Sequence, residues 1–179
     1  QAAGLGTGLI GDPQIARLSV AHGPHAVRLA RTLLGVGFEP VSVTARGYVD
    51  RSLAGWGRTR SAPTDRSEPT HGVRAELAWS GGRTALIDFN DTQYFSPIRA
   101  QHLSVHGIRG EVHDDSWSWV GDDGQLCRMR TAYERCGTHG DLDPLHLKRI
   151  SLGERTLFAN PFAPSSLSDE QIAIAETIR

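Results

Sequence analysis

Lysine is nearly absent from this sequence, because Lys148 is the single lysine among its 19 basic residues and arginine supplies the rest. An amine base or a Schiff-base mechanism would therefore depend on Lys148 or on a lysine from another domain. Cysteine is also scarce. Cys127 and Cys136 lack the C-x-x-C spacing of redox and zinc motifs, so we expect reduced thiols in a cytoplasmic protein.

Long apolar runs and an excess of charge of one sign are missing as well. No stretch approaches the roughly 20 apolar residues of a membrane-spanning helix, and no signal-peptide pattern opens the chain. A formal net charge of -1 gives no electrostatic attraction for nucleic acid. We therefore expect neither a membrane nor a nucleic acid as a partner.

The length and balance of the chain are typical of one globular domain. It has 179 residues, of which 39% are hydrophobic and 22% charged. The sequence does not begin with methionine, and its last residues continue a helical pattern up to Arg179. We therefore interpret residues 1–179 as a single domain cut from a longer protein.

The glycines near the start match a dinucleotide-binding pattern. Gly6-Thr-Gly8-Leu-Ile-Gly11 has the spacing G-x-G-x-x-G, but that loop binds a pyrophosphate only when a strand precedes it and a helix follows. Here no strand pattern precedes the glycines, and Asp12-Pro13 stands where the helix should continue. We interpret residues 1–12 as a flexible entry segment and assign no cofactor-binding residue to this chain.

Apolar periodicity predicts a helix followed by many strands. A period near 3.6 predicts a helix over Pro24–Leu34 that ends at Gly35, and a capping box at Ser168 and Gln171 predicts another at the end of the chain. Residues 51–70 have no periodicity and read as a long surface loop. Period-two alternation predicts hairpin-linked strands over 41–49, 73–79, 85–89, 102–106, 117–119, 126–133, 146–150 and 155–158. The expected fold class is α+β, an open, mostly antiparallel or mixed β-sheet with helices packed on one face.

Histidines supply the candidate chemistry. His22 and His25 bracket the start of the first helix, where the helix dipole favours a bound anion or a neutral, proton-accepting imidazole. A second cluster joins His139 and His146 with Asp141 and Asp143, and the two clusters together could ligate a metal. We favour a catalytic or substrate-contacting histidine over a metal ligand and assign no metal site.

Three polar residues share one face of the strand expected over 102–106. His102, Ser104 and His106 alternate with the apolar Leu103 and Val105. Such a row can contact a polyol or form part of a catalytic triad, but a partly exposed strand face is the preferred interpretation.

Four segments of the sequence resemble the C-terminal domain of the Gfo/Idh/MocA family of NAD(P)-dependent oxidoreductases. They are Ser-Val-Ala-His-Gly-Pro-His-Ala-Val-Arg-Leu-Ala-Arg-Thr-Leu-Leu-Gly-Val-Gly over 19–37, Phe-Ser-Pro-Ile-Arg-Ala-Gln-His-Leu-Ser-Val-His-Gly-Ile-Arg-Gly-Glu-Val over 95–112, Leu-Phe-Ala-Asn-Pro-Phe over 157–162, and Leu-Ser-Asp-Glu-Gln-Ile-Ala-Ile-Ala over 167–175. The family commonly carries D-x-x-x-H in its first helix. His25 falls on that histidine, whereas Ala21 stands where the family has aspartate.

The resemblance implies the substrate-binding half of an enzyme that transfers a hydride to or from a sugar, a sugar derivative or a cyclitol. It implies an N-terminal Rossmann domain that is absent from this chain, NAD or NADP bound by the full-length protein, and a homo-oligomer formed through the sheet. His25 and His22 become the catalytic candidates, and Arg28, Arg31 and His102 the substrate-binding candidates. We expect the isolated chain to be inactive and to bind no cofactor.

Two other classes remain open. Ala21 in place of the family's aspartate favours a noncatalytic carbohydrate-binding or assembly module. The histidine and aspartate clusters favour a metal-dependent hydrolase.

Overall fold

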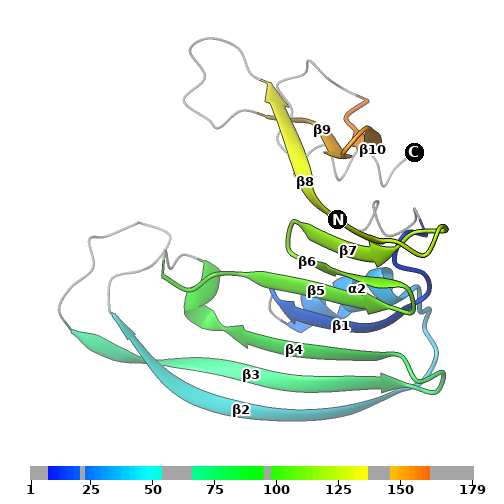
Figure 1. Cartoon of the computed structure of the whole chain (residues 1–179). Helices are drawn as coiled ribbons and strands as arrows, with labels where there is room; N and C mark the ends of the chain where they lie inside the picture. The colour runs from blue at the N-terminus through cyan, green and yellow to red at the C-terminus, as the bar shows by residue number, and fades with distance from the viewer. Residues whose placement is uncertain (1–7, 21–22, 54–65, 95–97, 137–145, 162–179) are drawn as a thin grey trace.

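A computed structural model of the chain describes residues 8–20, 23–53, 66–94, 98–136 and 146–161. Their strands form one sheet in the order β10-β9-β8-β7-β6-β5-β1-β4-β3-β2 (Figure 1). In chain order the elements are β1 (Pro13–Ser19), α2 (Gly23–Leu34), β2 (Val41–Leu53), β3 (Ser67–Trp79), β4 (Thr84–Asn90), the 3-10 helix η1 (Asp91–Tyr94), β5 (His102–Gly107), β6 (Gly110–His113), β7 (Ser116–Val120), β8 (Leu126–Cys136), β9 (His146–Leu152) and β10 (Arg155–Ala159).

The sheet is mixed because of its central strand, β1. This strand pairs in parallel with β4, with Ala16 opposite Ala85, and antiparallel with β5, with Ala16 opposite Val105. The other neighbouring strands pair antiparallel. The predicted open, mixed sheet is therefore confirmed, although β1 itself was not predicted.

One α-helix covers the middle of the sheet. α2 begins at Gly23 and ends at Leu34, as predicted to within one residue, and Gly35 follows it with a φ of 62°. Its buried side chains, among them Ala26, Ala30 and Leu33, belong to the same core as Leu18 of β1. The expectation of several packed helices was wrong for the described residues, in which α2 is the single α-helix; the helix predicted near the end of the chain lies outside them.

Alternation along the strands gives the sheet two different faces. The face covered by α2 carries the apolar core, including Ala16, Leu18, Ala85, Ile87, Leu103, Val105, Val112 and Trp117. On the opposite face, which we call the open face, polar side chains dominate, including Arg17, Thr44, Arg46, Arg74, Glu76, Asp88, His102 and Ser104. Figure 1 shows α2 behind β1 and β5, with β2 and β3 extending beyond it.

The apolar side of β2 and β3, the two strands at one edge of the sheet, is only partly covered. Val43 and Val49 of β2 are 59% and 63% exposed, and Val73 of β3 is 50% exposed. A helix of 12 residues is about 18 Å long and cannot cover two strands of 13 residues that also lie outside it in the sheet.

The segment that enters β1 is ordered by packing, which corrects part of the expectation for residues 1–12. Ile10 is fully buried, and its carbonyl oxygen accepts a hydrogen bond of 2.9 Å from the Arg109 backbone N–H. Gly107 allows this close approach, because a Cβ there would overlap the Ile10 carbonyl group. The described part of the glycine pattern, Gly8–Gly11, precedes a strand and does not join a strand to a helix. It therefore does not form a dinucleotide-binding loop.

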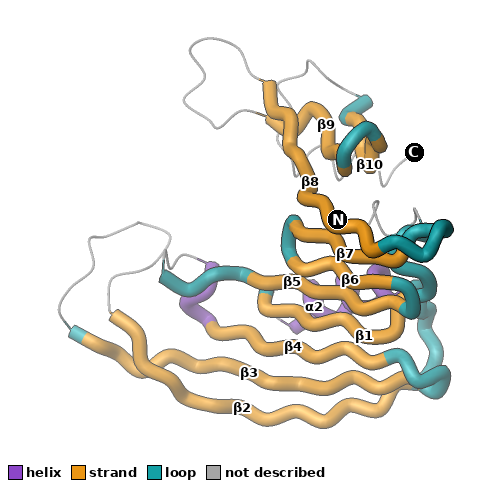
Figure 2. The backbone as a smooth tube through the Cα atoms, viewed as in Figure 1, coloured by secondary structure: helices purple, strands orange, loops and turns teal. Residues whose placement is uncertain are grey.

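Strand β8 links the larger part of the sheet to the hairpin β9–β10. Its first half, Leu126–Arg130, pairs with β7, and its second half pairs with β9. At the change of partner, the Thr131 backbone N–H donates to the Asp115 carbonyl oxygen at 2.7 Å, and the buried Trp117 Nε1 donates to Thr131 Oγ1 at 2.9 Å. Figure 2 shows β8 running from beside β7 to β9.

Two further outcomes concern predicted loops and membrane helices. Residues 51–53 and 67–70 extend β2 and β3, so the surface loop predicted over 51–70 was too long; residues 54–65 lie outside the described part of the chain. Across the ranges that the structure describes, no helix is long and apolar enough to cross a membrane.

Candidate functional site

A polar pocket of about 650 Å³ lies where the parallel strands β1 and β4 both end. We call it the carboxyl-end pocket. In open sheets that contain parallel strands, the carboxyl ends of those strands are the usual place for a ligand. The polar side chains that line it are Ser19, Tyr48, Asp50, Arg74, Asp88, Asn90, Gln93 and Arg99.

Ser19 and Gln93 form the hydrogen-bonded floor of this pocket. Ser19 Oγ donates to the Asp88 carbonyl oxygen at 2.6 Å and accepts from Gln93 Nε2 at 2.8 Å. Gln93 Oε1 in turn accepts from the Asn90 backbone N–H at 2.8 Å. Each side chain is therefore held in one orientation by a partner on a different element, which preorganises the pocket before any ligand arrives.

Asp88 is the charged centre of the pocket wall. Its carboxylate accepts from Tyr48 Oη at 2.8 Å and from Arg74 Nε at 3.2 Å, and the Arg74 guanidinium lies 4.6 Å from the centre of the Tyr48 ring. Burial and the hydrogen bond to Asp88 raise the pKa of Tyr48 above its usual value. Tyr48 is thus a neutral hydroxyl beside an ion pair, an arrangement suited to binding hydroxyl groups.

A second ion pair closes the outer rim of the pocket. Arg99 Nη2 lies 2.6 Å from Asp50 Oδ2 and 3.0 Å from the Arg51 carbonyl oxygen. The pKa of Asp50 is lowered by the backbone N–H of Arg51 and by the neighbouring Arg99. The rim therefore carries an ionised carboxylate and a fixed guanidinium.

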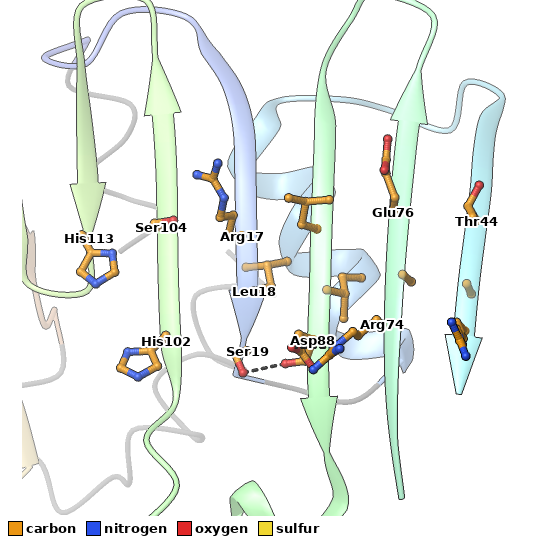
Figure 3. Close-up of a pocket in the computed structure, with 15 residues that line it drawn as sticks. Arg17, Leu18, Ser19, Thr44, Arg74, Glu76, Asp88, His102, Ser104 and His113 are labelled. Carbon is orange, nitrogen blue, oxygen red and sulfur yellow. Dashed lines mark hydrogen bonds and ion pairs between the residues drawn. The ribbon is translucent and has the colours of Figure 1, made fainter. Parts of the chain in front are cut away.

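A groove of about 650 Å³, which we call the open-face groove, lies beside the pocket on the open face. Ser19, Arg74 and Asp88 line both hollows, so the two are adjacent. The far wall of the groove carries His102, Ser104 and His113 (Figure 3). Figure 3 shows Asp88 and Ser19 together on one side and the two histidines on the other.

His25 lies in the first turn of α2, in the helical layer, and is exposed. Because α2 begins at Gly23, four residues after β1 ends at Ser19, the first turn of the helix stands at the same end of the sheet as the carboxyl-end pocket, but on the opposite face of the sheet. An apolar groove of about 350 Å³ begins beside this turn and is lined there by Gly23, Val27, His71 and Asp91.

The other predicted site residues are dispersed. Arg28 is exposed on α2. Arg31 Nε donates to the Gly37 carbonyl oxygen at 2.7 Å, and its guanidinium lies 3.6 Å from the centre of the Phe38 ring, near the far end of the helix. His102 projects from the open face, so the structure does not bring it together with His25.

Several predicted residues cannot be placed. His22, His139, Asp141 and Asp143 lie outside the described residues, and so does the side chain of His146. The metal-dependent hydrolase, whose ligands were predicted among these residues, stays a prediction.

The residues of the carboxyl-end pocket were missed by sequence reasoning. Asp88 stands as a charged residue between the buried Ile87 and Phe89, which is the ordinary alternation of a half-buried strand. Ser19 and Gln93 lie within hydrogen-bonding distance because β1 pairs in parallel with β4, and no local sequence pattern predicts that pairing.

Comparisons with known proteins found only distant similarity. No family model and no curated protein match the chain. Among solved structures, it is similar to an oxidoreductase from Pseudomonas syringae, with 15% identity over 72% of this chain and 37% of that one and a TM-score of 0.36. It is also similar to an inositol dehydrogenase homolog from Azotobacter vinelandii, complexed with NADH and myo-inositol, with 12% identity, 72% and 38% coverage and a TM-score of 0.37. A second structure of such a homolog, complexed with NAD+, has 11% identity, 72% and 39% coverage and a TM-score of 0.37. The chain spans less than two-fifths of the length of each of these proteins.

Proposed function

We propose that this chain is the substrate-side domain of an NAD(P)-dependent oxidoreductase that acts on a hydroxyl carbon of a sugar, a sugar derivative or a cyclitol. The observation that carries the proposal is the position of His25. It stands in the first turn of the helix that follows β1, at the end of the sheet where the parallel strands β1 and β4 both finish. The resemblance of residues 19–37 to the Gfo/Idh/MocA family supports the same role for His25.

The role of His25 is to exchange the hydroxyl proton of the substrate. Oxidation of a carbinol releases a proton from oxygen, and histidine is the side chain best suited to accept it near neutral pH. General acid–base catalysis of this kind contributes about 10²- to 10⁴-fold in rate. His22 is proposed as its neighbour.

We propose the carboxyl-end pocket as a separate binding site for hydroxyl groups, because its side chains project from the open face whereas His25 lies in the helical layer. The pocket offers a carboxylate acceptor in Asp88 and a guanidinium donor in Arg74 above the hydrogen-bonded pair of Ser19 and Gln93. Polyols present both donors and acceptors, and Asp88 and Arg74 match the two kinds. Arg28 and Arg31 remain proposed contacts to an acidic substrate or to another domain, and His102 a proposed contact to substrate in the open-face groove.

The described residues do not fit a nicotinamide cofactor by themselves. They contain no glycine-rich turn between a strand and a helix, since the Gly8–Gly11 turn precedes a strand. When bound, the cofactor supplies the hydride chemistry. We propose that a Rossmann domain elsewhere in the protein binds it, and that the isolated chain is inactive.

The proposal also places the protein in the cytoplasm as a homo-oligomer that associates through its sheet. The exposed valines of β2 and β3 support this assembly, because an apolar surface on adjacent strands favours a protein contact. Ala21 stands at the position of the family's aspartate. This substitution favours a second candidate function, a noncatalytic carbohydrate-binding or assembly module.

The decisive experiment is an activity assay of the intact gene product with NAD+ and NADP+ over a panel of sugars and cyclitols. The substitution His25→Ala should lower kcat by about 10²- to 10⁴-fold if His25 transfers the proton. Thr32→Ala is the matched control, because Thr32 is an exposed residue at the other end of the same helix. Turnover that is unchanged in His25→Ala would remove His25 from the mechanism. Sugar binding without turnover in the wild-type protein would support the binding module instead.

A further inference from the structure

Two histidines and an aspartate converge on the open face, away from α2. His102 begins β5, His113 ends β6, and Asp114 follows directly in the turn to β7. Ser104 pairs with His113, so His102 lies diagonally across from His113 on the same face. The rings of the two histidines stack with centroids 6.2 Å apart and planes 18° from parallel.

The backbone at Asp114 turns its carboxylate towards both imidazoles. Asp114 has a φ of 52°, the single positive φ of a non-glycine residue in the described ranges. Its backbone N–H donates to the Leu103 carbonyl oxygen at 2.8 Å, and its Oδ1 accepts from the Leu103 backbone N–H at 2.8 Å. The carboxylate is therefore anchored through one oxygen, while the other, Oδ2, faces the histidines.

That second oxygen and the two ring nitrogens are spaced like the ligands of one ion. Asp114 Oδ2 lies 3.0 Å from His102 Nδ1 and 3.7 Å from His113 Nε2, and one ligand atom from each residue lies within 4.8 Å of the others. Zn²⁺ binds nitrogen at about 2.0–2.1 Å and carboxylate oxygen at about 2.0–2.2 Å, so tetrahedral ligand atoms are about 3.3 Å apart. Small rotations of the two exposed imidazoles would complete this geometry.

We propose that His102, His113 and Asp114 bind one divalent transition-metal ion of the Zn²⁺ type. Two imidazoles with one carboxylate form a donor set that such ions prefer over Ca²⁺ and Mg²⁺, which take oxygen ligands. The hydrogen bond from Leu103 supplies the outer-shell support that ligating carboxylates commonly have. Both histidines line the open-face groove, so the remaining coordination position faces that groove and is open to water or to a ligand oxygen.

The site shares His102 with the proposed substrate contacts but is separate from the proposed proton transfer at His25, and its test does not use enzyme activity. The intact gene product, expressed without a histidine tag, is titrated with Co²⁺, whose visible absorption bands report both binding and coordination number. We expect saturation at one Co²⁺ per chain and displacement by Zn²⁺. His102→Ala and His113→Ala should each weaken binding by at least about 10- to 100-fold, the loss seen when even outer-shell partners are removed.

Two further variants make the result specific. Asp114→Asn keeps an oxygen for the Leu103 N–H and tolerates the positive φ, so it should fold and still lose affinity. His106→Ala is the control, because His106 is another histidine of β5, 2.7 Å from Arg17 Nη1 and 3.6 Å from Glu111 Oε2, and it should bind Co²⁺ like the wild type. Failure to saturate at one equivalent would overturn the proposal, and so would bands that persist in both His102→Ala and His113→Ala.

Discussion

The hydrogen bond between Trp117 and Thr131 gives the sharpest prediction about stability. Trp117 is 1% exposed and Thr131 is 8% exposed, so the 2.9 Å bond from Nε1 to Oγ1 is shielded from water. The substitution Thr131→Val keeps the shape of the side chain but leaves the indole N–H without an acceptor. An unsatisfied buried donor costs about 1–3 kcal/mol, and the added methyl group recovers up to about 0.8 kcal/mol. We expect the free energy of unfolding to fall by about 1–2 kcal/mol.

In a protein that already carries Trp117→Phe, we expect Thr131→Val to have the opposite effect on the free energy of unfolding. Without the indole N–H, Thr131 carries a buried hydroxyl that has lost its donor, and replacing it with valine should be neutral or stabilising. Urea unfolding of the 179-residue chain, followed by far-UV circular dichroism, measures all four members of the cycle and avoids the change in tryptophan fluorescence. If Thr131→Val had the same effect in both backgrounds to within about 0.5 kcal/mol, the two sites would be additive and the reasoning would be refuted.

Four other predictions each concern a single substitution. Gly110→Ala should destabilise the chain by about 1–3 kcal/mol in urea unfolding, because the new Cβ would overlap a carbonyl oxygen of β7. Asp88→Asn should lower the pKa of Tyr48 towards its usual value, which ultraviolet titration against a Tyr48→Phe control would detect. The pKa of Asp114 is lowered because the hydrogen bonds from His102 and the Leu103 backbone N–H together outweigh burial, the largest single contribution, which opposes ionisation. Its ionised form therefore stabilises the fold above the unfolded pKa, and this stability is lost as the pH falls through the folded pKa; Asp114→Asn should flatten acid unfolding below about pH 4. Val43→Arg should weaken the proposed homo-oligomer in sedimentation velocity, whereas an unchanged sedimentation coefficient would exclude that face of β2.

Elements with strong local patterns were predicted well from sequence. α2 combines a full 3.6-residue periodicity with a glycine stop, and the hairpin of β3 and β4 combines alternation with the Ser80-Gly81-Gly82 turn. These signals are local because the residues that cause them are neighbours in the chain.

Strand β1 was missed because its evidence is not local. Only Ala16 and Leu18 of its seven residues are buried, so the alternation of apolar residues along it is weak. Pro13 at its start gives no strand signal either, although proline is tolerated at the first residue of a strand. What makes the segment a strand is its pairing with β4 and β5, which a sequence pattern does not encode.

The same distinction separates the two parts of the candidate site. The position of His25 in the first turn of α2 was predicted because the start of a helix can be recognised locally, and its role stays a prediction. Ser19, Asp88 and Gln93 were not found, since their proximity depends on the register between β1 and β4. His102 was predicted to be partly exposed, which is confirmed, but its nearness to His113 and Asp114 required the pairing of β5 with β6.

The central place of β1 also sets the order in which the molecule can assemble. Ser19 bonds to a residue 69 positions away, and Arg17 to one 89 positions away. During synthesis at about 5–20 residues per second, β1 therefore leaves the ribosome about 5–20 seconds before its partner β5. The hairpins β3–β4, β5–β6 and β6–β7 have short loops and local contacts, so β1 joins them through a costlier loop closure. The carboxyl-end pocket is completed only in that step, and a ligand that fills it would stabilise the molecule against the release of its first strand.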